Sequence, residues 1–236
     1  MIAYKFLSAD RVGLFSGFRW PEPGIWIDAE GKADPRVSGI HALSAEGLLD
    51  WIDDELWTCE LAGIVEDDRH VLVAERGRLL ERVEAWDESM ALDFARACAA
   101  RGREQVVEAL RLEGHEDEAQ ELGGCDAEGF VKSAPGLAAQ LPVEIGGLVL
   151  MAADTTAIAE GLRLEARRPA LKSHLEAVAA SGATPGAIAA NVAFVVAHSA
   201  AGLHPAGYEA GVAAERAWQR EPPRRTARSR RRGLTP

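Results

Sequence analysis

Three side chains among the first 86 residues have the chemistry of a catalytic site: Arg19, His41 and Glu60. His41 follows Gly39 in a predicted short turn, where a histidine can bind a ligand or exchange a proton near neutral pH. An arginine that holds a dinucleotide and a strand glutamate that stabilises developing positive charge would complete an ADP-ribosyltransferase-like site. Their order and spacing match no defined motif, so the hypothesis of such an enzyme rests on analogy alone. The structural alternative, which we favour for His41, is a ring that bonds a backbone carbonyl and fixes the turn.

Motifs for metals and nucleotides are absent from the sequence. No C-x-x-C or H-x-x-x-H pair occurs, and there is no Walker loop, G-x-S-x-G or G-x-G-x-x-G segment. The run His115–Glu118 carries ligand-type atoms, but an acidic run is more often a solvated face. We therefore expect no metal site and no cofactor. The cysteines, Cys59, Cys98 and Cys125, are odd in number and widely spaced, which favours a reducing cytoplasm over a disulfide framework.

The charge of the chain is divided unevenly. Residues 220–236 hold seven arginines and one glutamate and so carry +6, which leaves −17 on the other 219 residues of a chain with net charge −11. An acidic body repels phosphate, so any polyanion contact would fall to the tail. The candidate contacts are Arg224, Arg225, Arg228, Arg230, Arg231 and Arg232. Because the tail has no aromatic side chain for base stacking, we favour a solvated tail, a protein partner or self-association over nucleic acid.

The elements that would position these residues differ between the two parts of the chain. Five of the six tryptophans precede Asp87, and the sequence after it is rich in alanine. Aromatic residues suit sheets and alanine suits packed helices. The predicted strands are 3–7, 25–27, 56–61, 70–75 and 78–86, joined as a β-meander with turns at 66–68 and Gly77. In the third of these strands Trp57, Cys59 and Leu61 share one face.

Helices are predicted on both sides of a glycine-rich acidic segment. Ser44 begins a short helix that ends near Trp51, and Asp87 caps a long one that ends near Leu112. The segment 114–136 is predicted to be loop with at most one short helix. Further helices should begin at Pro169, at Thr184-Pro185 and at Pro205. The longest apolar run, 148–153, is far shorter than the roughly 20 residues that cross a bilayer, so no membrane contact is expected.

A family resemblance covers about residues 2–86. Tyr4-Lys5, Gly17-Phe18-Arg19, Ser38-Gly-Ile-His-Ala42 and then Leu56-Trp57 and Glu60–Gly63 follow one another in the order of a known pattern. In this order they resemble a group of uncharacterised bacterial and phage domains with a YK strand, a GF-R segment and an SG-[FI]-H-A-C core. Position 43 is leucine where that pattern has cysteine, which puts any thiol role in doubt. The resemblance implies a domain but no mechanism.

The sequence thus predicts an α+β protein in three parts. These are an antiparallel β-rich domain with a short helix (1–86), an alanine-rich helical domain (87–219) and a disordered arginine-rich tail (220–236). Since no catalytic constellation is complete, we expect a non-catalytic cytoplasmic binding or protein-interaction module. The alternative, an ADP-ribosyltransferase-like enzyme, requires Arg19, His41 and Glu60 to converge on one cleft.

Overall fold

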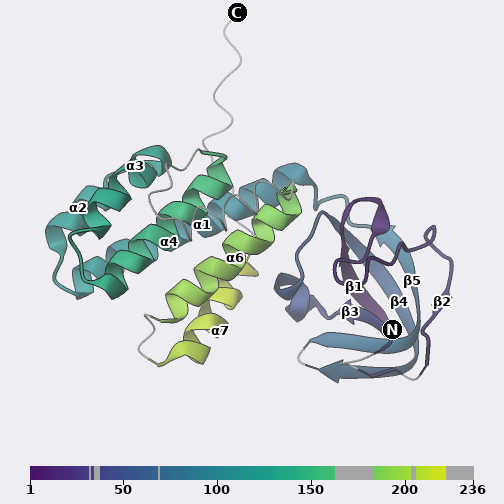
Figure 1. The fold of residues 1–236 in the computed structure, drawn as a ribbon. Helices are drawn as coiled ribbons and strands as arrows, with labels where there is room; N and C mark the ends of the chain where they lie inside the picture. Colours follow the sequence, from purple (N-terminus) through teal and green to yellow (C-terminus); the bar gives the residue numbers. More distant parts are fainter. Residues whose placement is uncertain (32, 35–37, 69, 163–182, 203–205, 222–236) are drawn as a thin grey trace, which may run out of the picture.

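The computed structural model places an antiparallel sheet at the amino-terminal end and helices after it (Figure 1). It describes residues 1–31, 33–34, 38–68, 70–162, 183–202 and 206–221. The α+β class is confirmed, and so is the change from strand to helix at Asp87. The Asp87 side chain caps the first long helix by accepting a hydrogen bond of 2.7 Å from the backbone N–H of Met90. The tail from residue 222 lies outside the described residues.

Among the described residues, five strands make up the sheet, and two 3₁₀ helices accompany them. The strands are β1 (Ile2–Leu7), β2 (Ile27–Asp28), β3 (Ile40–Leu43), β4 (Glu55–Asp68) and β5 (Val71–Arg82), and the short helices are η1 (Ala9–Arg11) and η2 (Ala45–Asp50). β1 pairs with β3 and β4, while β5 pairs with β2, β3 and β4. The four strands β1, β4, β5 and β3 therefore close into a small barrel, and β2 extends it. The predicted β-meander is wrong, since β4 and β5 alone are both consecutive and paired among the described strands.

The strands β4 and β5 are longer than predicted, and the two predicted turns are wrong. β4 continues through 66–68, and the chain reverses at His70, whose φ is 76°. Gly77 is a strand residue with Leu61 opposite it on one side and Ile27 on the other. The side chain of Ile40 lies so close that a Cβ at Gly77 would be 2.6 Å from its Cγ2. Here glycine marks close packing within a sheet and not a turn.

The barrel has an apolar interior and one apolar outer face. As predicted, Trp57, Cys59 and Leu61 point to one side, which is the interior. The other buried members of this interior cluster are Ala3, Leu7, Trp20, Ala42, Leu72, Ala74 and Leu79. On the outer face, Phe6, Leu43 and Leu56 pack against the helices. Both faces of the sheet are thus used, one by the barrel and one by the helical part.

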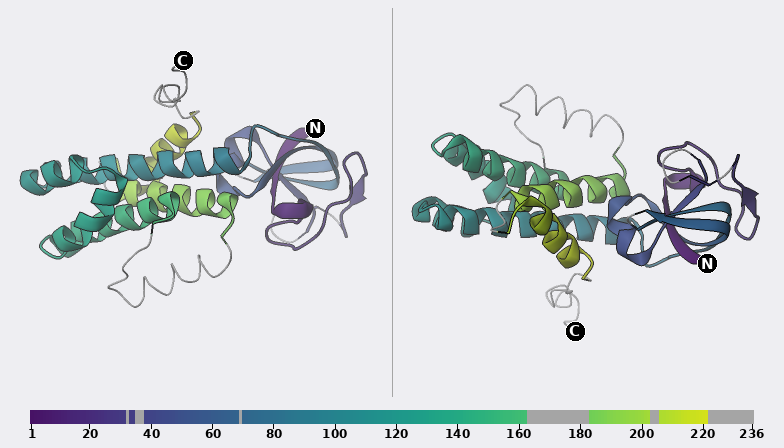
Figure 2. Two further views of the ribbon diagram at one scale, coloured as in Figure 1. Left: turned by 90° about the horizontal axis from the view of Figure 1, so that it is seen from above. Right: turned by 90° about the horizontal axis from the view of Figure 1, so that it is seen from below.

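The helices extend away from the barrel as an elongated body (Figure 2). They are α1 (Glu88–Leu112), α2 (Glu116–Gly123), α3 (Ala127–Ala138), α4 (Val143–Glu160), α6 (Pro185–Ala201) and α7 (Tyr208–Gln219). The helices predicted from Asp87 and from Thr184-Pro185 are confirmed as α1 and α6. The last helix of the described residues, α7, begins at Tyr208. The helix predicted from Pro169 lies outside the described residues, and so does Pro205.

The segment 114–136 contains α2 and most of α3, so its prediction as loop is wrong. Ala119, Leu122 and Phe130 are buried in a cluster with residues of α1 and α4. Asp126 caps α3, because its carboxylate accepts a hydrogen bond of 2.8 Å from the N–H of Gly129. Tertiary burial of three apolar side chains outweighs the low helix propensity of the surrounding glycines.

A joint of close contacts holds the barrel against the helices. One buried cluster contains Phe6 and Leu43 from the barrel together with Phe94 of α1 and Val192 of α6. Asp54 caps α6 by accepting a hydrogen bond of 3.0 Å from the N–H of Gly186. The parts before and after Asp87 therefore share a core, and their division into two domains stays a prediction.

Candidate functional site

A cleft of about 710 Å³ opens on the side of the barrel. Its walls come from β1 and β3, from the loop between η1 and β2, from the residues just after β2, and from Trp51 after η2. β1 and β3 are paired at one position, Tyr4 opposite Leu43. Beyond that pair, Lys5 and Phe6 of β1 and Ile40 and His41 of β3 line the cleft.

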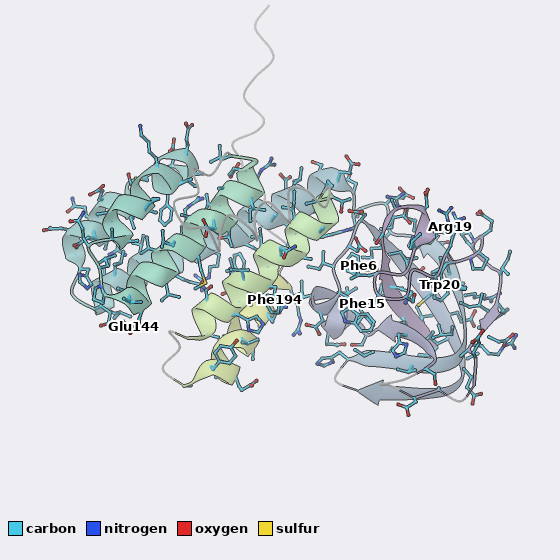
Figure 3. The ribbon with its side chains drawn as sticks, viewed as in Figure 1. Phe6, Phe15, Arg19, Trp20, Glu144 and Phe194 are labelled. Carbon is cyan, nitrogen blue, oxygen red and sulfur yellow. The ribbon has the colours of Figure 1, made fainter. Side chains whose placement is uncertain are left out.

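Aromatic rings form much of the wall. The Trp20 ring is buried and meets the Phe18 ring edge-on, with centroids 6.1 Å apart. The Phe15 ring meets Trp51 in the same way at 5.6 Å. Phe15 is nevertheless 77% exposed, and its neighbours Leu14 and Phe18 are nearly half exposed. Figure 3 shows Phe6, Phe15 and Trp20 on the barrel, far from the labelled Glu144 of the helical part. Three exposed apolar side chains on one loop make an apolar rim.

Lys5 supplies a cation to this cleft. Its ammonium donates a hydrogen bond of 2.6 Å to the backbone carbonyl of His41 and lies 5.3 Å from the centroid of the Trp20 ring. Burial lowers the pKa of Lys5 from 10.5 to about 8, because desolvation disfavours the charged form. Lys5 was not among the site residues predicted from the sequence. A signal was present, since Lys5 stands between Ala3 and Leu7 on the interior face of β1, and lysine is rare at such a position.

His41 lies in the cleft, in the unpredicted strand β3 and not in the predicted turn, and its ring makes the contact of the structural alternative. Its Nδ1 is 3.1 Å from the carbonyl oxygen of Gly39. Gly39 has a φ of 126°, and a Cβ there would lie 2.5 Å from Cγ1 of Val73. The His41 ring therefore helps to fix the turn that leads into β3, while its backbone carbonyl holds Lys5.

Arg19 and Glu60 do not join His41. Arg19 is exposed and forms an ion pair of 3.6 Å with Asp10. Glu60 accepts hydrogen bonds of 2.8 and 2.6 Å from Arg78, which lies opposite it in β5 and over the Trp26 ring. Neither residue lines the cleft. The convergence that an ADP-ribosyltransferase-like site requires is therefore not found.

The remaining predictions concern the arginine-rich tail, a metal site and the membrane. The polyanion candidates from Arg224 to Arg232 lie outside the described residues. Within the described ranges, no three His, Cys, Asp or Glu side chains gather as a metal site would need. In the same part of the chain, no helix combines the length and apolarity that crossing a membrane takes.

A second groove, of about 820 Å³, runs along α1, α2 and α7. Glu215 of α7 lies in its wall and is 3% exposed. Its carboxylate accepts a hydrogen bond of 2.5 Å from Gln105 and lies 3.6 Å from Nε of Arg101. Burial raises the pKa of Glu215, and Arg101 offsets part of this rise. This carboxylate fastens α7 to α1.

The raised pKa of Glu215 predicts a pH-dependent stability. The folded state holds this proton more tightly than the unfolded state, so the free energy of unfolding falls as pH rises from the usual value of 4.5 through the raised pKa. Glu215→Gln keeps the shape and cannot ionise. We expect this variant to gain stability relative to the wild type between pH 4 and pH 7, measured by urea denaturation at each pH.

The matched control for this experiment is Glu104→Gln. Glu104 is exposed and lies 3.7 Å from the same arginine, Arg101, so its replacement removes a charge without removing a buried carboxylate. A pH-dependent gain as large in this control as in Glu215→Gln would contradict the assignment to burial.

Comparison with known proteins adds no relative. No family model, no curated protein and no solved structure matches the chain. The resemblance of residues 2–86 to a group of bacterial and phage domains therefore stays a prediction.

Proposed function

We propose that this protein is a non-catalytic binding module and that its barrel cleft takes the ring of a small molecule. The observation that carries this proposal is the exposed apolar rim, Leu14, Phe15 and Phe18, around a cleft with aromatic walls. The volume of about 710 Å³ is within the range of small-molecule sites, roughly 300 to 1,000 Å³. A bound ring would cover side chains that water now contacts.

The contacts of the walls support a ring as the bound group. Phe15 and Trp51 already meet edge to face, so a third ring can pack against both. Such aromatic pairs contribute about 0.5 to 1.5 kcal/mol each beyond the area they bury. The enzyme alternative has no comparable support, because Arg19 and Glu60 are held in ion pairs away from the cleft.

A reducing cytoplasm is part of the same proposal. All three cysteines are free thiols, and Cys59 and Cys98 are buried. Proteins of oxidising compartments more often join their cysteines into disulfides. A protein partner or self-association through the arginine-rich tail stays a prediction.

The test uses 3-phenylpropionamide, a neutral probe with one ring. In a titration followed by NMR, we expect chemical-shift changes at Phe15, Trp20 and Trp51. Phe15→Ser should weaken binding roughly fivefold to tenfold, the equivalent of one aromatic contact. Because Phe15 is exposed, this variant should stay folded.

The control for this titration is Val143→Ser. Val143 is 85% exposed at the start of α4, far from the barrel, so its replacement should leave binding unchanged. Shift changes scattered over the surface, or an affinity indifferent to Phe15→Ser, would refute the proposed function.

A further inference from the structure

Lys5 is unusual among the cations of this chain, which has four lysines and 22 arginines. Arginines of the barrel lie beside carboxylates: Arg11 pairs with Glu22, Arg76 with Asp28 and Arg78 with Glu60. Among the residues that the structure describes, no carboxylate forms an ion pair with Lys5, which has the carbonyl of His41 and the ring of Trp20 as neighbours. Lys5 is half-buried, and the hydration that its ammonium loses is costly unless an anion compensates it.

Within the part of the chain that the structure describes, the titratable groups around Lys5 supply no such anion. Cys59 of β4 faces it from the barrel interior, and burial raises the pKa of this thiol to about 12, so it is neutral at physiological pH. The His41 ring is bonded to Gly39, as described above. Asp28 and Glu30 also line the cleft, but Asp28 is paired with Arg76 and Glu30 is exposed at its edge.

We propose that the ligand of this cleft carries a carboxylate in addition to its ring, and that Lys5 is the residue that binds it. The inference rests on the proposed function, since it assigns a polar end to the same ligand. An ammonium has three donors, and the His41 carbonyl takes one, which leaves two for the two oxygens of a carboxylate. In a cleft with aromatic walls, this charge-assisted pair is stronger than it would be in water.

The protonation of Lys5 gives the pair a pH signature. Burial holds the pKa of free Lys5 at about 8, and a bound carboxylate favours the charged form and raises that pKa. Binding therefore takes up a proton above pH 8. Since the neutral amine cannot pair with an anion, the affinity for a carboxylate falls roughly tenfold for each pH unit above the pKa of the free protein.

The experiment compares 3-phenylpropionate with 3-phenylpropionamide by calorimetry on the full chain. The two probes share the ring and the spacer and differ in the charge of the end group. We expect the acid to bind at least tenfold more tightly than the amide at pH 7. This preference should shrink by about tenfold between pH 7 and pH 9 and disappear in Lys5→Met. Lys132→Met, which removes an exposed lysine of α3, should keep the full preference.

The outcomes separate this inference from the proposed function. If acid and amide bind equally at the cleft, Lys5 is not the anion site and the proposed function survives. If neither probe binds there, both are refuted. Should Lys5→Met fail to fold, the wild-type protein still decides: a preference for the acid that is constant from pH 7 to pH 9, without proton uptake, overturns the assignment to Lys5.

Discussion

Gly186→Ala should lower the free energy of unfolding by about 3 kcal/mol, because the joint between barrel and helices leaves no room for a methyl group. A Cβ at this position would lie 2.3 Å from the carbonyl carbon of Asp53, 2.4 Å from the nitrogen of Asp54 and 2.6 Å from the oxygen of Asp53. All three atoms are backbone, so no change of side-chain rotamer relieves the overlap. The contact between α6 and the segment before β4 must open, and guanidinium denaturation measures the loss.

The matched control is Gly147→Ala in α4. Nothing lies within 4 Å of a Cβ built there, so alanine gains helix propensity without a clash. We expect this variant to be more stable than the wild type by roughly 0.5 to 1 kcal/mol. A Gly186→Ala variant as stable as the wild type would show that Gly186 of α6 does not pack against the backbone of Asp53 and Asp54.

Trp86→Ala should cost about 3 kcal/mol, the low end of the usual range for removing a large ring, because Trp86 is partly buried against the shared cluster. The Trp86 ring lies edge-on to Phe6 of the barrel, with centroids 5.4 Å apart, and to Phe94 of α1 at 6.0 Å. Its Nε1–H donates a hydrogen bond of 2.8 Å to the carbonyl of Asp53. Because these contacts join the two parts, barrel and helices should lose stability together. Helical circular dichroism and NMR signals of the barrel, followed in one denaturant series, measure both.

Two further variants separate the roles of this tryptophan. Trp26→Ala removes a ring from the barrel surface, where it lies under Arg76 and Arg78, and should cost about 1 kcal/mol. Trp86→Phe keeps a ring but leaves the Asp53 carbonyl without its donor, and should cost about 1 to 3 kcal/mol. If Trp86→Ala shifted the helical transition and left that of the barrel unchanged, the shared cluster would not couple the two parts.

The joint also bears on the candidate site. The backbone carbonyl of Asp53 accepts the hydrogen bond from Trp86. The side-chain carboxylate of Asp53 accepts another hydrogen bond, of 2.6 Å, from the hydroxyl of Ser8, which follows β1. Burial raises the pKa of the Asp53 carboxyl, and the bonds from Ser8 and the backbone of Asp54 offset part of that rise. Lys5 belongs to β1 and lines the cleft. The hydrogen bonds of Asp53 therefore connect the helical part with the strand that holds the proposed ligand-binding cation.

The sequence by itself determined the local features of this protein. Alternation placed Trp57, Cys59 and Leu61 on one face, the Asp87 cap marked the start of the helical part, and Thr184-Pro185 predicted the start of α6. These signals depend on neighbours within a few residues, and they can therefore be recognised in the amino-acid sequence. Glycine was the exception: Gly77 looked like a turn, and only its cross-strand neighbours show that it is a packing position.

Only the tertiary structure showed that the strands close into a barrel and which residues form the candidate site. Periodicity tells which face of a strand is apolar, but not which strand it pairs with, so the ring of β1, β4, β5 and β3 was not predictable. It also cannot show that Glu60 is held by Arg78 or that Lys5 meets Trp20, because residues far apart in the chain make these contacts. The charge state of a side chain follows from its surroundings. Lys5 became a candidate for function once the fold placed it, half-buried, in a cleft with aromatic walls.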